Sequence, residues 1–256
     1  GLKTAIRGDN GAGKTTLLNL IYQKFKRSGG ESGILHGEFS ESQNESAITQ
    51  AIVDDSIYIV PRAKIGYFHQ NFENLDYNKS VLENVMDGSV QSQTVARTIL
   101  ARLLIAGDEV YKKVGVLSGG ERIKVSFAKL FVSDANVLLL DEPTNYLDMM
   151  SIEALQDVLA GYEGTVLFVS HDSVFTDAVA DRLLILENGR VTEFEGKLKE
   201  YEISMKKPSA AVKSETEKLI LQMRLTEIIS KLSMPGSDKE ALEEEYRRLL
   251  EQLKQF

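Results

Sequence analysis

The stretch Gly8-Asp9-Asn10-Gly11-Ala12-Gly13-Lys14-Thr15 decides the fold. It matches the pattern G-x-x-x-x-G-K-[ST] at every fixed position. The alternating residues 2–7 before it predict a strand, and the apolar residues 16–22 after it predict a helix. A glycine-rich loop between a strand and a helix turns its backbone N–H groups inward and is typical of a phosphate-binding loop.

Each residue type in this loop suits the binding of a nucleoside triphosphate. The backbone N–H groups would surround the β-phosphate, and the helix N-terminus adds partial positive charge. Lys14 is expected to reach the β- and γ-phosphates, and the Thr15 hydroxyl to take one position on Mg²⁺. The predicted phosphate-binding residues are Asn10, Gly11, Ala12, Gly13, Lys14, Thr15 and Thr16. A dinucleotide fingerprint fails because Thr16 stands where its third glycine belongs, which leaves a chance glycine turn as the alternative.

A second apolar run, residues 136–140, ends in Asp141 and Glu142. A central parallel strand is apolar on both faces and presents its polar residues at its carboxyl end, where ligands bind. We therefore expect Asp141 to hold Mg²⁺, usually through water, and Glu142 to polarise the attacking water. The alternative is a solvated strand end that happens to carry two acids, and the phosphate-binding loop in the same chain disfavours it.

A third apolar run, residues 166–169, is followed by Ser170, His171 and Asp172. A lone histidine is more often structural than functional. The position of His171 at the end of another such strand nevertheless predicts a contact with the γ-phosphate. His36 and His69 have no such context, and we interpret both as structural.

The composition is that of a globular protein. The 256 residues are 43% hydrophobic and 27% charged, with a formal net charge of −8. The absence of cysteine excludes disulfides, thiolate zinc sites and cysteine nucleophiles, and fits a cytoplasmic location. The apolar runs are shorter than the roughly 18 residues of a membrane span. The acidic balance argues against free nucleic acid as the main ligand without excluding a basic patch.

Leu117-Ser118-Gly119-Gly120-Glu121 lies between the phosphate-binding loop and Asp141, and with it the sequence resembles the ATP-binding cassette (ABC) family. This stretch is similar to the family's signature motif. Residues 66–70 resemble its Q-loop, residues 141–148 its joined Walker B motif and D-loop, and residues 170–172 its H-loop. The resemblance covers about residues 2–200. It implies the α/β fold of a P-loop NTPase, in which helices flank a parallel-core sheet, with a small antiparallel subdomain within residues 33–70 and a helical signature subdomain within residues 80–130.

The resemblance also implies an ATPase whose site is shared between two cassettes. The implied catalytic residues are Glu142, His171 and Gln70, and the implied metal ligands are Thr15, Gln70 and Asp141. Ser118, Gly119 and Gly120 would bind the γ-phosphate of an ATP held by a second ABC cassette, in the same polypeptide or in a second copy. ATP would close the two cassettes face to face, and hydrolysis would release them. The chain has one copy of each motif and so resembles half of such a pair.

Within the family, E-P-T-N-x-L-D at residues 142–148 resembles the ABC-F group, which are soluble paired cassettes that act on the ribosome. Residues 70–117 are also fewer than transport cassettes use to receive a membrane partner. The resemblance therefore implies a translation factor or a protein of antibiotic resistance that protects the ribosome. Two alternatives remain: a nucleotide-binding energy subunit of an ABC transporter, and a clamp for which ATP binding rather than turnover is the function.

We expect two domains, an ABC cassette at residues 1–205 and a helical hairpin extension at residues 206–256. The chain opens directly on a strand without an initiator methionine, so we interpret it as a piece of a longer polypeptide. The cassette would then lack its first strands, and the aromatic residue that stacks on adenine would lie upstream. The polar residues 28–56 are interpreted as a loop or insertion.

Two apolar stripes predict the hairpin. Apolar residues follow a 4-3-4 spacing within residues 221–232 and a 4-3-4-3 spacing within residues 242–256. Met234-Pro235-Gly236 separates them. The stripes could pack on each other or on the cassette, or the hairpin could be an arm that touches ribosomal RNA. A linker between cassettes would be longer and more basic, which favours the second cassette of a pair with its C-terminal extension.

Overall fold

A computed structural model describes residues 1–29, 57–68, 75–187, 190–206, 224–225, 228 and 246–249. The chain divides into two compact units, Gly1–Lys199 and Glu200–Phe256. Most of the polar segment 28–56, Gln70 and most of the predicted hairpin lie outside the described residues. In the second unit, Ile228 and Leu249 are buried helical residues, and they belong to the two predicted apolar stripes.

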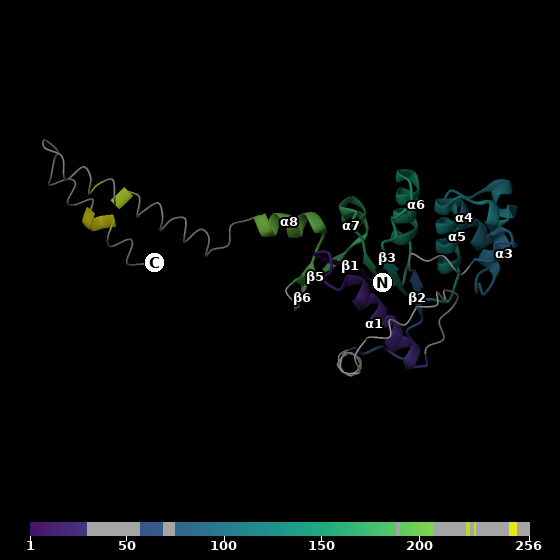
Figure 1. The fold of residues 1–256 in the computed structure, drawn as a ribbon, viewed down its shortest axis with the longest axis horizontal. Helices are drawn as coiled ribbons and strands as arrows, with labels where there is room; N and C mark the ends of the chain where they lie inside the picture. Colours follow the sequence, from purple (N-terminus) through teal and green to yellow (C-terminus); the bar gives the residue numbers. More distant parts are fainter. Residues whose placement is uncertain are drawn as a thin grey trace. The chain divides into compact units, whose positions relative to one another are not determined.

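Strands and helices alternate along the first unit (Figure 1). The strands are β1 (Lys3–Gly8), β2 (Ile65–Phe68), β3 (Val137–Asp141), β4 (Thr165–Val169), β5 (Arg182–Glu187) and β6 (Arg190–Glu195). The helices of this unit are α1 (Lys14–Arg27), α3 (Val81–Met86), α4 (Gln93–Arg102), α5 (Gly119–Phe131), α6 (Met149–Ala160) and α7 (Ser173–Val179). A further helix, α8 (Leu198–Lys206), begins in the first unit and belongs mostly to the second. Two 3₁₀ turns, η1 (Gly107–Tyr111) and η2 (Val114–Val116), precede α5.

The strands form one sheet in the order β2-β3-β4-β1-β5-β6. All neighbouring pairs are parallel except β5 and β6, which are antiparallel. The register sets Asp141 opposite Val169, and Ile6 opposite the same Val169 from the other side. The carboxyl ends of β1, β3 and β4 therefore meet at one edge of the sheet, and the predicted α/β parallel-core sheet is confirmed.

Helices cover both faces of this sheet, with α1 drawn on one side and α6 and α7 on the other (Figure 1). Leu18, Tyr22 and Phe25 of α1 pack in one buried cluster with Ile6 and Leu139 of the sheet. Fully burying a leucine or phenylalanine side chain contributes roughly 1.5–3 kcal/mol. This cluster therefore fixes the start of α1, and with it the loop that precedes the helix.

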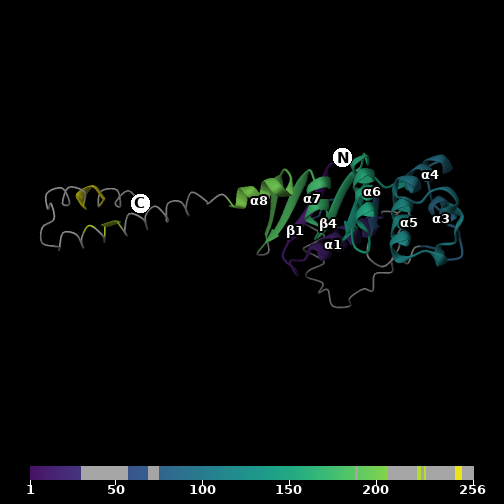
Figure 2. The same ribbon diagram turned by 90° about the horizontal axis from the view of Figure 1, so that it is seen from above.

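The predicted helical part is present, as α3, α4 and α5 pack on one another at one end of the sheet (Figure 2). Both α3 and α5 begin with a capping box, from Ser80 to Glu83 and from Ser118 to Glu121. Phe127 of α5 stacks on Phe68 of β2 with ring centroids 4.2 Å apart, which joins the helical part to the sheet. Of the predicted antiparallel subdomain, the described Ile65–Phe68 pairs parallel to β3, and the rest lies outside the described residues apart from 57–64.

We expect Gly164→Ala to lower the free energy of unfolding by about 1–3 kcal/mol, because an added methyl group would overpack the contact between Gly164 and Asn136. The Cβ atom would lie 2.6 Å from the backbone oxygen of Asn136, where β4 approaches β3. Thermal and urea unfolding would measure the loss. Gly119→Ala is the matched control: its Cβ meets nothing within 4 Å, so that variant should be as stable as the original chain or more stable. Equal stability of the two variants would contradict the close approach at Gly164.

Candidate functional site

The loop between β1 and α1 is shaped to receive an anion. Gly11 and Gly13 have φ angles of 83° and 91°. This left-handed conformation is strained for residues that carry a side chain. Gly8 is needed for another reason, since a Cβ atom there would lie 2.4 Å from the backbone oxygen of Leu186. Gly13 is the N-cap of α1 and has no capping side chain. The N–H groups of the first helical turn are thereby left for a ligand.

Lys14 lies along this loop with only 9% of its surface exposed. Its Nζ donates hydrogen bonds to the backbone oxygens of Gly8 at 2.8 Å and Asp9 at 2.9 Å. These carbonyls hold the ammonium group against the loop. The arrangement can present a fixed positive charge to a phosphate, as the sequence predicted for this residue.

Thr15 and Asp141 meet across the edge of the sheet. The Thr15 Oγ1 atom donates a hydrogen bond to Asp141 Oδ1 over 3.1 Å. A hydroxyl and a carboxylate are the oxygen ligands that Mg²⁺ accepts, and Mg²⁺ usually keeps several waters and substrate phosphates besides. Among the described residues, no group of three or more His, Asp or Glu side chains could hold a metal ion by itself. The hydroxyl of Thr15 and the carboxylate of Asp141 are thus two oxygen atoms of the kind that Mg²⁺ binds.

Glu142 follows Asp141 directly and lies against His171. The backbone N–H of His171 donates to Glu142 Oε2 over 3.1 Å. Glu142 Oε1 is buried and accepts no hydrogen bond from the described residues, although His171 Nε2 lies 3.3 Å away. Burial is the main reason that the pKa of the Glu142 carboxyl is raised, and the hydrogen bond and charge of His171 oppose it. A largely buried carboxylate with a raised pKa is suited to take a proton from a water molecule.

Three residues that the sequence analysis gave no role hold this edge together. Thr144 Oγ1 and Ser170 Oγ lie 3.3 Å apart in a buried hydrogen bond, which ties the segment after Glu142 to the segment before His171. Arg7 of β1 donates to the backbone oxygen of Ser170 over 3.2 Å. Small hydroxyl residues near the carboxyl ends of neighbouring strands were the only signal in the sequence.

The signature residues form the N-terminus of α5. Ser118 is the N-cap, and both its N–H and its Oγ lie 2.7 Å from Glu121 Oε2. A Cβ atom on Gly119 would meet nothing within 4 Å, whereas one on Gly120 would lie 3.0 Å from the backbone oxygen of Tyr146. The described part of this chain therefore leaves open space beside Gly119.

The structure thus brings the predicted residues together in two groups. Lys14, Thr15, Asp141, Glu142 and His171 lie at the carboxyl edge of the sheet. Ser118, Gly119 and Gly120 open α5, which packs against α3 and α4 rather than on α1 (Figure 2). Gln70, predicted as both a catalytic and a metal-binding residue, lies outside the described residues.

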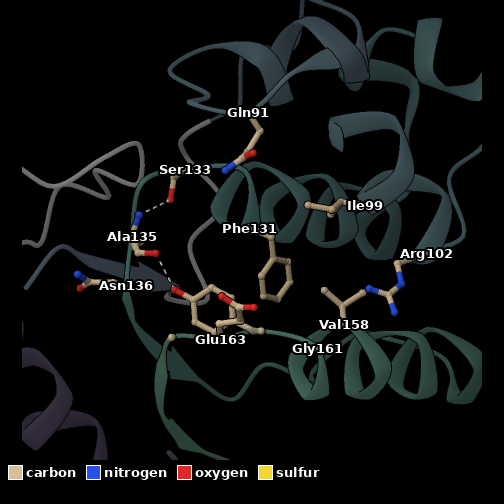
Figure 3. A pocket seen from close by; sticks show the side chains of 12 residues that line it. Gln91, Ile99, Arg102, Phe131, Ser133, Ala135, Asn136, Val158, Gly161 and Glu163 are labelled. Carbon is tan, nitrogen blue, oxygen red and sulfur yellow. Dashed lines mark hydrogen bonds between the residues drawn. The ribbon is translucent and has the colours of Figure 1, made fainter. Parts of the chain in front are cut away.

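One cavity lies beside this edge of the sheet, and another lies away from it. One, of about 390 Å³, is lined by the loop residues 9–12 together with Leu186 and Glu187, beside the candidate phosphate site. The other, of about 410 Å³, lies at the amino ends of β3 and β4, between the last residues of α4, α5 and α6 (Figure 3). Figure 3 shows Phe131 pointing into this second cavity and Arg102 at its rim. It is remote from the strand ends that carry Asp141 and Glu142.

Within the part of the chain that the structure describes, no helix is both long enough and apolar enough to span a membrane.

Comparisons with known proteins agree with this geometry. A family model described as "ABC transporter" matches residues 1–145. The Escherichia coli O157:H7 protein named "Probable ATP-binding protein YbiT" is 35% identical over 204 residues, which cover 78% of this chain and 34% of that protein. "ABC transporter F family member 5" of Arabidopsis thaliana is 35% identical over 198 residues, which cover 77% of this chain and 25% of that protein. The chain thus spans about a third of the first relative and a quarter of the second.

Among solved structures, cbiO1 from Clostridium perfringens, described as part of the ABC transporter complex cbiONQ, has a TM-score of 0.52. It is 25% identical, and the match covers 79% of each chain. The sheet with its phosphate-binding loop, the paired carboxylates and the helical part therefore have the arrangement of an ABC cassette. The chain belongs to the ABC transporter family, in which it corresponds to the ATP-binding cassette.

Proposed function

We propose that this chain is the ATP-hydrolysing cassette of an ABC-F protein that acts on the ribosome, driven by ATP-dependent closure against a partner cassette. The observation that carries the catalytic part is the position of Glu142, which is 12% exposed beside His171 and directly follows Asp141. A largely buried carboxylate at the same sheet edge as a phosphate-binding loop suits the activation of water.

In this proposal, the residues at the sheet edge divide the work. Lys14 and the N–H groups of residues 10–16 bind and orient the phosphates of ATP. Thr15 and Asp141, joined at 3.1 Å, would hold Mg²⁺ together with Gln70, and the ion would neutralise charge on the phosphates. Glu142 accepts a proton from the attacking water, and its raised pKa strengthens it as a base. His171 orients Glu142 and would contact the γ-phosphate.

The second part of the proposal is a partner cassette, in the same polypeptide or as a second copy. Ser118 and the first N–H groups of α5 are donors for an anion, and Gly119 borders space that the described residues of this chain leave open. The fold of the chain itself does not require a glycine there, since its φ is not left-handed and no neighbour is close. The γ-phosphate of an ATP bound by the partner would fill this space.

The ribosome as target is supported by sequence and by relatives. Asn145 gives the form E-P-T-N-Y-L-D, which resembles ABC-F cassettes, and one relative is named an F family member. We propose a cytoplasmic translation factor or antibiotic resistance protein, with the cassette at residues 1–205, a helical hairpin at residues 206–256, and the second position in a pair. The division of the chain near Lys199 supports such a boundary. The likeness to a subunit of a transporter complex supports the alternative of a transporter energy subunit.

We expect Glu142→Gln to lower the turnover of ATP by roughly 100- to 10,000-fold, the range in which general bases contribute. The amide keeps the size of the side chain but cannot accept the proton from water, so ATP binding should persist. Phosphate release and binding of a fluorescent ATP analogue measure the two effects. Glu163→Gln, at an exposed position before the amino end of β4 and away from the carboxyl ends that carry the site, is the matched control and should behave as the original chain. Undiminished turnover in Glu142→Gln would refute the assigned base.

We expect Gly119→Asp to abolish ATP-dependent pairing and turnover, because the new carboxylate would repel the partner's γ-phosphate. The fold should be unharmed, since there is room for the side chain and an acid suits a helix N-terminus. Size-exclusion chromatography of the Glu142→Gln chain with Mg-ATP would measure pairing. Val90→Asp adds the same charge at an exposed site near the other end of α5 and should pair normally. Retained pairing and turnover in Gly119→Asp would rule out the shared site.

We expect the full-length parent protein carrying Glu142→Gln to pellet with ribosomes in the presence of Mg-ATP and to remain in the supernatant without it. The reason is that blocked hydrolysis should hold the cassettes in their closed, ribosome-bound form. Co-sedimentation through a sucrose cushion is the measurement, with Glu163→Gln as the hydrolysing control. ATP binding without pelleting would exclude the ribosome and favour the transporter alternative.

A further inference from the structure

The turn that leads into the signature residues is built on a segment from another part of the chain. Residues 76–80 precede α3 and lie against residues 112–116. The N–H of Gly115 donates to the Tyr77 oxygen over 3.0 Å, and the N–H of Val114 donates to the Lys79 oxygen over 3.0 Å. Ser80 and Lys113 form an antiparallel bridge. The path of the chain just before Ser118 is therefore set by residues 76–80.

Gly115 permits this close approach. A Cβ atom on it would lie 2.9 Å from the backbone oxygen of Tyr77, closer than real Cβ contacts. The contact brings the Tyr77 ring next to the first turn of α5, where Arg122 lies.

Arg122 joins the two segments from the side of the helix. Its guanidinium carbon lies 4.9 Å from the centre of the Tyr77 ring, within the range of a cation–π interaction. Its Nε donates to the Val114 oxygen over 3.4 Å, and its Nη2 donates to the Gly115 oxygen over 3.2 Å. The Arg122 side chain thus connects α5 with the 3₁₀ turn η2 and with Tyr77, which packs on that turn.

The position of Arg122 is costly for the helix itself. A cation in the first turn of a helix is disfavoured, because the N-terminal end carries partial positive charge. The contacts with Tyr77 and with two carbonyl oxygens offset this cost. They also hold the guanidinium at the Val114 and Gly115 oxygens, directly before the residue that caps α5.

We propose that Tyr77 and Arg122 form a clamp that positions the signature turn for the ATP held by the partner cassette. The clamp consists of the Tyr77 ring, the Arg122 guanidinium and the backbone of Val114 and Gly115. This inference rests on the proposed sharing of the site between two cassettes. Both side chains are positioning residues: they act through Ser118 and Gly119, and the site they serve belongs to the other cassette.

The first test compares kinetic constants of variants in the 256-residue chain. Arg122→Ala and Tyr77→Ala should lower kcat by roughly 10- to 100-fold, the loss that a small misplacement of a catalytic group produces. Binding of a fluorescent ATP analogue by each variant should be unchanged, because the phosphate-binding loop of the same chain is intact. Tyr77→Phe keeps the ring and should retain the original kcat.

Arg97→Ala is the matched control. The Arg97 guanidinium carbon lies 5.2 Å from the centre of the Tyr111 ring, and its Nη1 donates to the Tyr111 hydroxyl over 2.8 Å. This pair has the same chemistry in the same helical part but does not touch residues 114–118 in any described contact. Its loss should leave kcat unchanged. An equal loss of kcat in Arg97→Ala and Arg122→Ala would overturn the clamp, since it would mean a general effect on the helical part.

The second test asks which cassette the clamp serves. An equimolar mixture of Arg122→Ala and Lys14→Ala chains contains pairs with one intact site, made of the loop of the first chain and the signature turn of the second. The mixture should therefore turn over ATP well above the sum of the separate variants. With pairing of the chains established by size-exclusion chromatography in Mg-ATP, no gain on mixing would show that Arg122 serves its own chain and would overturn the proposal. Weakened ATP binding by Arg122→Ala alone would overturn it as well.

The Gly119→Asp variant separates failure of the clamp from failure of the proposed shared site. Loss of turnover in Gly119→Asp together with normal turnover in Arg122→Ala leaves the shared site standing and rejects the clamp. Normal turnover in Gly119→Asp rejects both.

Discussion

The parallel pairing of β1, β3 and β4 is the constraint on which the rest of this structure depends. It brings Thr15 and Asp141, which are 126 positions apart in the sequence, within 3.1 Å of each other. It also places His171 against Glu142. The buried cluster between α1 and the sheet helps to keep this register, since a slip of one residue would turn the buried side chains of a strand to the opposite face. The positions of the polar residues at the edge of the sheet therefore depend on apolar packing elsewhere in the sheet.

Much of this arrangement was predictable because the deciding signals are local. A glycine loop between an apolar strand and an apolar helix fixes where β1 ends and where α1 begins, and acids after apolar runs mark the carboxyl ends of buried strands. The parallel sheet and the convergence of Thr15, Asp141, Glu142 and His171 at its edge followed from these patterns. The capping box of Ser118 and Glu121, which the structure shows, explains why α5 begins at Gly119.

Contacts between distant segments could not be read in the same way. The hydrogen bonds of Arg7 and Thr144 to Ser170 depend on how three strand ends sit in space, and no spacing in the sequence encodes them. Glu142 has a φ of 50°, which is uncommon for a residue with a side chain. Its surroundings, and not its own preference, impose that conformation. Arg122 is a further case, because its place in the first turn of α5 looks unfavourable until Tyr77 is seen beside it.

The capping box at the start of α5 has one more consequence. Glu121 Oε2 already accepts hydrogen bonds from the N–H and the hydroxyl of Ser118, and these bonds lower the pKa of the Glu121 carboxyl, so the group stays ionised. An incoming phosphate that takes the Ser118 hydroxyl must therefore displace a carboxylate from it. In the proposed shared site, binding would exchange one anion for another at this helix end, because Glu121 would have to give up the Ser118 hydroxyl. In that proposal, Glu121 competes with the ligand for the Ser118 hydroxyl, so the strength of the Ser118–Glu121 hydrogen bonds would set how readily the turn accepts a phosphate.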